Sequence, residues 1–339
     1  MSDRKDQILE FLANTDWKDA KITPLAGDAS NRRYDRLTDA ETGNTAVLMD
    51  ADPTKGESIQ SFIAIAQYLK GIGLSAPAIF AKNMNQGLLI LEDLGDALYA
   101  KVVLQDPKLE EPLYEYAIDV LIASHRHDPP DGLAIYDPQI MADMACLSLD
   151  WYAMGVGQPV TTSDREDFHN LIKLTLDDLE PYSKVLIQRD YHAENLIWLP
   201  YRSDVARVGL LDFQDAMMGH PAYDLVSLLQ DARRDVDTGL AQRMITRYVD
   251  STDQDSDTFH KAIAMMGAQR NLRILGVFAR LSMHFGKPHY VDFIPRVWNY
   301  LQADLINAKL KDYVDRLLPP PTPDRLQMLK DKCATIPNL

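Results

Sequence analysis

The chain has 339 residues, of which 46% are hydrophobic and 25% charged, and its formal net charge is −15 at pH 7. These values are ordinary for a folded globular protein that is large enough for two lobes, and they exclude disordered and fibrous classes. The negative charge argues against nucleic acid or an anionic membrane as a partner, because binding to phosphate groups relies on concentrated Lys and Arg.

The sequence shows no targeting or membrane segment. Its start, MSDRKDQ, has no apolar signal core, and no run approaches the roughly 20 apolar residues of a membrane span. Cys146 and Cys333 lie far apart without metal-ligand spacing, which favours reduced thiols. We therefore expect a cytoplasmic protein, and no obligate protein partner is evident.

The N-terminal part predicts a small lobe with an antiparallel sheet. Apolar residues at helical spacing predict a helix over residues 4–13. Runs of strand formers follow at residues 22–25, 34–37 and 46–49, then a helix between Gly56 and Gly71, then strands at residues 78–80 and 88–91. The predicted order is therefore β-β-β-α-β-β.

The pattern turns helical after Gly95. Predicted helices lie near residues 111–125, 138–152, 163–179, 221–233, 238–250, 257–284 and 289–314, interrupted only by a strand-loop-strand segment. The proline-rich stretch 319–323 predicts a stiff connector before one last short helix. The fold class is α+β, and we expect a small nucleotide-binding lobe over residues 1–94 and a larger helical lobe over residues 95–339.

The most informative motif is the loop QRDYHAEN at residues 188–195, followed by Asp212 at the end of an apolar run. An Asp-x4-Asn loop followed by a further Asp is typical of phosphoryl transfer. One carboxylate must orient the attacking hydroxyl, and other oxygens must hold Mg²⁺ on the nucleotide phosphates. Asp190 fits the first role, and Asn195 and Asp212 fit the second.

At this motif the chain resembles the aminoglycoside phosphotransferase family, whose members are small-molecule kinases. The match runs through residues 188–195, 211–215 and 221–225, with further stretches at residues 27–34, 48–51, 91–95 and 269–272. Within that family the chain looks most like the bacterial anomeric sugar kinases of cell-wall recycling, which act on N-acetylmuramate and N-acetylglucosamine. The resemblance implies a protein-kinase-like two-lobe fold, ATP and Mg²⁺ as cofactors, and a small-molecule amino sugar as the substrate.

The resemblance also implies roles for three residues near the motif. Asp215 would complete a D-x-x-D arrangement at the metal site, or it is a turn aspartate. His192 would approach the transferring phosphate or bond to the backbone of the loop. Asp224 opens an apolar helix, so we expect it to cap that helix or to brace the loop rather than to take part in the chemistry.

In the small lobe, the turn at residues 27–31 takes the place of a phosphate-covering loop, so Ser30 and Asn31 are expected at the phosphates. By the same resemblance, the backbone at Glu92 and Leu94 is the adenine-binding hinge.

The third strand reads VLMD where most kinases carry a phosphate-binding Lys. Because successive strand residues point to opposite faces, one of Arg32 and Arg33 is expected to supply the missing charge. Glu57 would hold that arginine in an ion pair, or it is a solvated residue at the start of a helix.

For the acceptor, Arg270 and Asn271 are notable polar residues on an apolar helix. They would bind the acetamido group or the carboxylate of the sugar, or Arg270 pairs with an acidic neighbour. Trp151 and Tyr152 would stack on a sugar face or belong to the core.

Two other functions stay open. An aminoglycoside, choline or homoserine phosphotransferase would place acidic residues around its cationic acceptor. The missing lysine would also suit a catalytically degraded nucleotide-binding protein, although the presence of Asp190, Asn195 and Asp212 together argues against that function.

Overall fold

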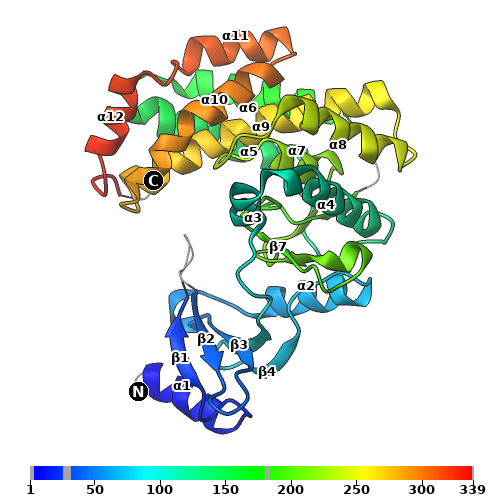
Figure 1. Ribbon diagram of the computed structural model, residues 1–339. Helices are drawn as coiled ribbons and strands as arrows, with labels where there is room; N and C mark the ends of the chain where they lie inside the picture. The colour runs from blue at the N-terminus through cyan, green and yellow to red at the C-terminus, as the bar shows by residue number, and fades with distance from the viewer. Residues whose placement is uncertain (1–3, 26–31, 180–183, 338–339) are drawn as a thin grey trace. The chain divides into compact units, whose positions relative to one another are not determined.

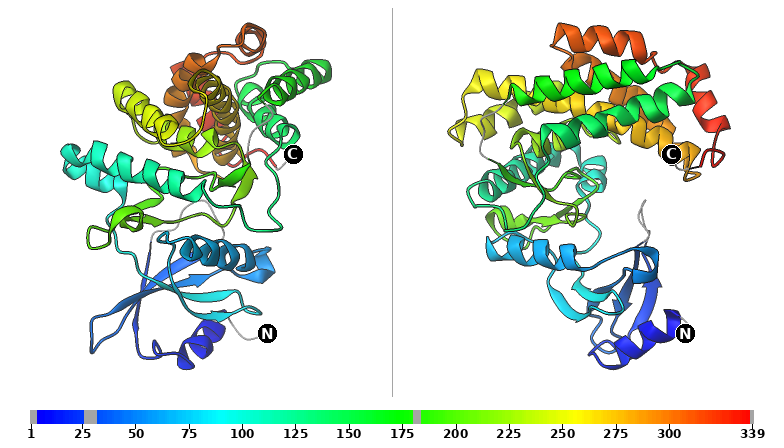
Figure 2. Two further views of the ribbon diagram at one scale, coloured as in Figure 1. Left: turned by 90° about the vertical axis from the view of Figure 1, so that its right-hand side faces the viewer. Right: turned by 180° about the vertical axis from the view of Figure 1, so that it is seen from behind.

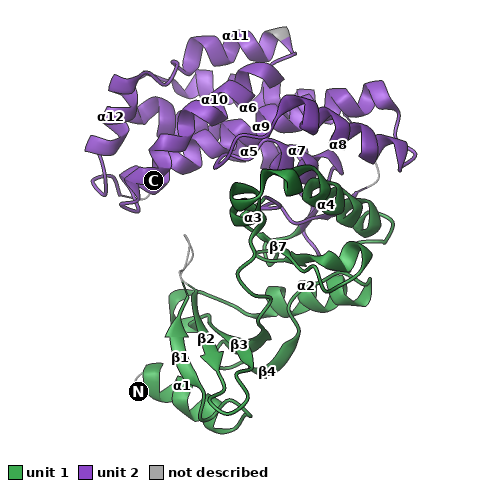
Figure 3. Cartoon of the chain, viewed as in Figure 1, with its two compact units in different colours: residues 1–130, 193–216 green, residues 131–192, 217–339 purple. Residues whose placement is uncertain are grey.

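The computed structural model describes residues 4–25, 32–179 and 184–337, and the chain forms two compact units (Figures 1 and 3). Unit 1 comprises Met1–Pro130 and Ala193–Ala216, and unit 2 comprises Asp131–His192 and Met217–Leu339. The loop at residues 188–195 therefore passes from unit 2 into unit 1. The boundary expected at residue 94 divides a nucleotide-binding lobe from a helical lobe, and this functional division stays a prediction.

Unit 1 contains the expected five-stranded antiparallel sheet, in the order β1-β2-β3-β5-β4. The predicted order β-β-β-α-β-β is confirmed. The elements of unit 1 are α1 (Arg4–Ala13), β1 (Lys21–Pro24), β2 (Arg33–Thr38), β3 (Thr45–Asp50), α2 (Gln60–Gly71), β4 (Ile79–Asn83), β5 (Leu88–Glu92), α3 (Tyr99–Gln105), α4 (Glu110–Ser124), β7 (Leu196–Trp198) and β8 (Val208–Leu210).

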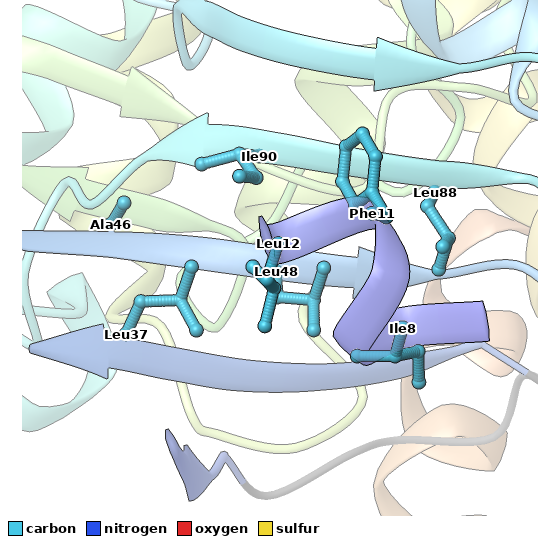
Figure 4. Close-up of a cluster of buried hydrophobic side chains, with 8 residues drawn as sticks. All are labelled: Ile8, Phe11, Leu12, Leu37, Ala46, Leu48, Leu88 and Ile90. Atoms are coloured by element: carbon cyan, nitrogen blue, oxygen red, sulfur yellow. The ribbon is translucent and has the colours of Figure 1, made fainter. Parts of the chain in front are cut away.

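Helix α1 covers one face of this sheet (Figure 4). Its apolar side chains Ile8, Phe11 and Leu12 recur at helical spacing and pack on strand residues that include Leu37 and Leu48. Burial of each such side chain stabilises the unit by roughly 1.5–3 kcal/mol. Because neighbouring strand residues alternate between faces, residues adjacent to Leu37 and Leu48 in sequence point to the other face.

Unit 2 is mostly helical, and its long helix α9 packs against α5, α6, α7 and α10 (Figure 2). The elements of unit 2 are α5 (Pro138–Leu147), α6 (Thr162–Asp177), β6 (Val185–Ile187), β9 (Met217–Gly219), α7 (Ala222–Leu229), α8 (Thr238–Asp250), α9 (Ser256–Met283), α10 (Ile294–Asp304), α11 (Ala308–Leu317) and α12 (Pro323–Asp331), with a π-helical turn at Ser148–Ala153 after α5. No helix among the described residues is long and apolar enough to cross a membrane.

Three details differ from the sequence prediction. The single helix expected at residues 289–314 is divided into a 3₁₀ turn at Pro288–Phe293, α10 and α11, because the Asn307 side chain caps α11 by accepting from the Leu310 N–H. The short helix α3 and the three-residue strand β9 are additional elements. Helix α7 ends at Leu229, earlier than expected.

Helices α5 and α9 approach each other closely at Gly276. A Cβ atom there would lie 2.2 Å from the backbone carbonyl carbon and oxygen of Leu147, which cannot move aside as a side chain can. We expect Gly276→Ala to lower the free energy of unfolding by about 2–3 kcal/mol, as overpacking does. Urea unfolding measures this, with Gly71→Ala as the control, because nothing lies within 4 Å of a Cβ at Gly71. Equal stability of the two variants would contradict the close approach.

Candidate active site

The loop that begins after β6 is held in a strained conformation by α7. Arg189 has a positive φ of 73°, a conformation that is uncommon for a residue with a side chain. In the first turn of α7, the Asp224 carboxylate accepts the N–H groups of Gln188 at 2.6 Å and Arg189 at 2.9 Å, and Ser227 Oγ donates to the Arg189 carbonyl at 3.2 Å. Asp224 is therefore a buried brace for the loop, one of the two roles expected from the sequence.

Asp190 follows directly in this braced loop and is half-buried. Burial raises the pKa of Asp190, but the neighbouring positive charges, Arg273 first, lower that pKa further, so the net shift is downward. The carboxyl group therefore stays ionised at neutral pH. An ionised carboxylate is the form that can accept a hydrogen bond from an acceptor hydroxyl and take its proton.

His192 is buried, and its Nε2 lies 3.2 Å from Arg233 Nη1. Since an arginine can only donate, Nε2 is the accepting nitrogen of a neutral ring. Burial lowers the pKa of His192 to about 4, which keeps the ring neutral at pH 7. These contacts support a structural role for His192, and its catalytic role stays a prediction.

The metal-binding candidates lie in unit 1, at one end of the antiparallel pair β7–β8. Asn195 immediately precedes β7, and its carbonyl accepts from the Leu211 N–H at 3.0 Å, which brings Asn195 beside the residue before Asp212. Asp212 has a positive φ of 56°, and its Oδ1 accepts from Gln214 Nε2 at 2.6 Å. The pairing of β7 with β8 thus brings the backbone of Asn195 next to the segment of Asp212, although the two residues are seventeen positions apart.

Phe213 anchors the segment that carries Asp212. Its side chain is fully buried, and its ring centroid lies 4.9 Å from that of Phe62 on α2. This contact fixes Asp212 relative to the small-lobe helix, while the Asp212 and Asp215 side chains remain exposed. The neighbouring Gln214 has a buried Oε1 atom with no hydrogen-bond partner among the described residues.

These residues fit a magnesium ion that is shared with a nucleotide. The described residues hold no cluster of three or more His, Cys, Asp or Glu that could bind a metal alone. Mg²⁺ usually takes only one or two protein carboxylates and completes its shell with substrate phosphates and water. An exposed Asp212 carboxylate, next in sequence to the Leu211 N–H that donates to the Asn195 backbone carbonyl, suits that demand, and the metal role of Asp215 stays a prediction.

Arg32 and Arg33 have different partners. Arg32 Nε lies 3.0 Å from Glu57 Oε2, with both side chains largely buried. Arg33 is 60% exposed and lies 3.3 Å from Asp35, on the face of the sheet opposite to Arg32. The expected ion pair with Glu57 is thus present, and Arg32 makes it. Ser30 and Asn31 lie outside the described residues.

Tyr34 is influenced by the charges of both Arg32 and Asp212, the latter on the candidate metal-binding segment. It pairs across the sheet with Met49, the residue at the position where most kinases carry lysine. Burial raises the pKa of Tyr34 to about 12, the charge of Arg32 opposes that rise, and the charge of Asp212 adds to it. Arg32 and Asp212 therefore both act on one tyrosine, on the sheet face that does not contact α1.

The predicted hinge is tightly bonded. The Glu92 N–H donates to the Ala78 carbonyl at 2.7 Å, and the Glu92 carboxylate accepts the Ala78 N–H and pairs with Arg202. The Leu94 side chain is buried against Ile197 and Leu199. These contacts make the segment rigid, and adenine binding by its backbone stays a prediction.

The acceptor candidates on α9 make internal hydrogen bonds. Arg270 Nη2 donates to Ser227 Oγ at 2.9 Å, and Asn271 Nδ2 donates to Gln230 Oε1 at 2.7 Å and to Asp304 Oδ2 at 3.2 Å. Their substrate-binding roles stay predictions. Arg273, one turn after Arg270, is a functional candidate that the sequence reasoning missed, although the spacing of three could have indicated it.

Two aromatic candidates for sugar stacking, Trp151 and Tyr152, lie in the core of unit 2. The Tyr152 hydroxyl donates to the Pro319 carbonyl at 2.7 Å. The core role that the sequence left open for them is therefore the one observed.

Asp304 makes the stability of unit 2 depend on pH. It accepts hydrogen bonds from Gln230 and Asn271, and burial raises its pKa to about 7. Because this pKa lies above the unfolded value of about 3.9, the folded state binds the proton more tightly, and stability falls as pH rises from about 4 to about 7. In the wild type, the free energy of unfolding should fall as the pH is raised from about 5 to about 8. We expect this fall to be smaller in Asp304→Asn by on the order of 2 kcal/mol. Urea titrations at both pH values check this, with exposed Asp253→Asn as the control, and an unchanged pH dependence in Asp304→Asn would contradict it.

The comparisons with known proteins agree with this arrangement. Residues 21–258 match the model of a family described as phosphotransferase enzymes. An N-acetylmuramate/N-acetylglucosamine kinase of Caulobacter vibrioides is 36% identical over 94% of this chain and 98% of its own length, and one of Pseudomonas aeruginosa is 31% identical over 84% of this chain and 83% of its own length.

Solved structures show the same fold at low sequence identity. The gentamicin complex of the aminoglycoside phosphotransferase APH(2")-IIa has a TM-score of 0.61 at 14% identity and covers 91% of this chain and 99% of its own. A microcompartment-associated aminopropanol kinase also has a TM-score of 0.61 at 14% identity, covering 88% of this chain and 98% of its own. The α+β, protein-kinase-like fold expected from the sequence is thus confirmed. With a family model matched over most of its length and relatives above 30% identity, the chain belongs to the phosphotransferase enzyme family.

Proposed function

We propose that the protein is an ATP- and Mg²⁺-dependent kinase that phosphorylates the anomeric hydroxyl of N-acetylmuramate and N-acetylglucosamine. The observation that carries this proposal is Asp190, an ionised carboxylate in a strained loop braced by Asp224. The names of the relatives support the choice of sugar. Such an enzyme would serve the recycling of cell-wall sugars in the cytoplasm.

In the proposed mechanism, Asp190 accepts a hydrogen bond from the acceptor hydroxyl and then its proton. Asn195 and Asp212 would hold Mg²⁺, which supplies charge neutralisation on the nucleotide phosphates. Arg32, kept in place by Glu57, would bind a nucleotide phosphate in the role that a lysine has in most kinases. The protein contributes mainly positioning and charge, since phosphoryl transfer requires little covalent chemistry from it.

The charges around Asp190 favour a neutral or anionic acceptor. Arg273, Arg270 and Arg189 are the cations that act on this aspartate within unit 2. A polycationic aminoglycoside would be repelled there, because like charges at short range raise the free energy of binding. The ionised Asp190 also argues against a degraded kinase, which has no need of a prepared base.

The test is ADP release with Mg²⁺ and ATP, in parallel reactions with N-acetylmuramate, N-acetylglucosamine, kanamycin, choline and homoserine. We expect turnover only with the two N-acetylated sugars. Turnover with kanamycin, choline or homoserine instead would overturn the proposed acceptor. ATP binding with no turnover on any acceptor would favour the degraded nucleotide-binding protein.

A further inference from the structure

Three arginines lie on one stripe of α9. Arg270, Arg273 and Arg280 are separated by three and seven positions, so at about 100° per residue their side chains fall within a sector of about 80°. Arg270 is almost fully buried and donates to Ser227 Oγ and to the Gln230 carbonyl. Arg270 therefore joins α9 to α7, whereas Arg273 and Arg280 are only half-buried.

Arg273 and Arg280 are half-buried cations. Burial lowers the pKa of Arg273, but the neighbouring Tyr223, Tyr136 and Asp190 raise it by more, so the net shift is upward. Among the residues that the structure describes, neither forms a salt bridge, although α9 belongs to a chain with an excess of acidic residues. Arg280 Nε is buried and has no hydrogen-bond partner among the described residues. Burial lowers the pKa of Arg280, and the charge of Arg273 lowers it further, so the two guanidinium groups repel each other.

Arg280 is a partly desolvated cation with an unsatisfied Nε and a second guanidinium group nearby, an arrangement that is costly unless an anion joins it. Arg273 is also the foremost of the charges that act on Asp190, which places it beside the proposed acceptor site. Arg280 lies two helical turns, or about 10 Å, further along the axis of α9. The pair therefore extends from the reacting hydroxyl towards a more distant part of the acceptor.

We propose that Arg273 and Arg280 form a binding subsite for a carboxylate of the acceptor, and that this subsite selects acidic amino sugars such as N-acetylmuramate over neutral ones. The proposal rests on the proposed function and names a specificity determinant of that site. Guanidinium groups suit a carboxylate because their N–H donors match its two oxygens. Arg270 has a structural role in this account, since its two terminal nitrogens donate to the Gln230 carbonyl and to Ser227 Oγ of α7.

The decisive variant is Arg280→Gln, because Arg280 is remote from Asp190 and its loss should spare the chemistry. We expect kcat/KM for N-acetylmuramate to fall about 10- to 100-fold, mainly through KM, as for one lost charged hydrogen bond. The value for N-acetylglucosamine, which has no carboxylate, should change less than about threefold. The methyl ester of N-acetylmuramate should behave as the neutral sugar does with the wild-type and the variant enzymes.

Arg273→Gln serves as the second variant, and Arg316→Gln, at an exposed position of unit 2, is the control. Arg273→Gln should show the same selective loss together with a smaller loss on both sugars, because it also removes a charge that acts on Asp190. Equal losses on both sugars in both variants would overturn the subsite and make these arginines positioning residues, and unchanged kinetics would overturn it as well. A wild-type enzyme that turns over neither sugar would instead refute the proposed function, so the two failures are distinguishable.

Discussion

Asp190→Asn is expected to lower kcat by about 100- to 10,000-fold, the range associated with removal of a general base. The amide cannot take the proton of the acceptor hydroxyl, although it is close to the carboxylate in shape. The KM for ATP should change less than about threefold, because Asp190 is assigned to the acceptor. Steady-state ADP release at saturating ATP and sugar measures both parameters.

Loss of folding must be separated from loss of catalysis in this variant. Asp190 is surrounded by arginines, so removal of its charge will also lower stability. Thermal unfolding of the variant should still show a single folded population at the assay temperature, and exposed Asp253→Asn provides the charge-matched control. A folded Asp190→Asn enzyme with wild-type kcat would show that Asp190 is not the catalytic residue.

Arg32→Gln is expected to have the second largest effect, with a fall of about 100-fold in kcat/KM for ATP. The strand position that carries lysine in most kinases is Met49, which is fully buried and cannot bind phosphate. Arg32 is held by Glu57 at 3.0 Å and acts on the same tyrosine as Asp212. It is therefore the cation that we expect to contact the nucleotide phosphates.

The adjacent arginine offers a matched control. Arg33→Gln removes the same chemical group, but its side chain is 60% exposed and lies near Asp35 and Asp50. We expect this variant to keep kcat/KM for ATP within about threefold of the wild type, and Arg32→Lys to restore part of the activity lost in Arg32→Gln. A larger effect of Arg33→Gln than of Arg32→Gln would contradict the assignment.

Local patterns in the sequence were sufficient to predict the sheet of unit 1, and they also indicated the candidate catalytic motif, whose roles stay predictions. Helical spacing in residues 4–13 and alternation in the strands follow directly from which side chains must be buried. Asp190 and Asn195 lie in one short loop, and Asp212 follows the strand pair β7–β8. All three residues fall within a segment of 25 residues. These features need no information about distant parts of the chain.

Contacts between distant segments could not be predicted in the same way. The choice between Arg32 and Arg33 depends on Glu57, which lies 25 positions further on. The amide of Asn271 bonds to Asp304 of α10 and Gln230 after α7, which no helical pattern reveals. Strand β9 has only three residues and exists because it pairs with β6, so its own sequence carries too weak a signal.

The most direct test of the proposed activity is identification of the phosphorylated product by ³¹P NMR after incubation with Mg²⁺, ATP and N-acetylmuramate. We predict one new phosphomonoester signal that couples to the anomeric proton of the sugar, formed in equal amount to ADP. A signal coupled to another position would keep the kinase but move the acceptor hydroxyl. Inorganic phosphate as the only product, or no product at all, would contradict the assignment of this protein as an amino-sugar kinase.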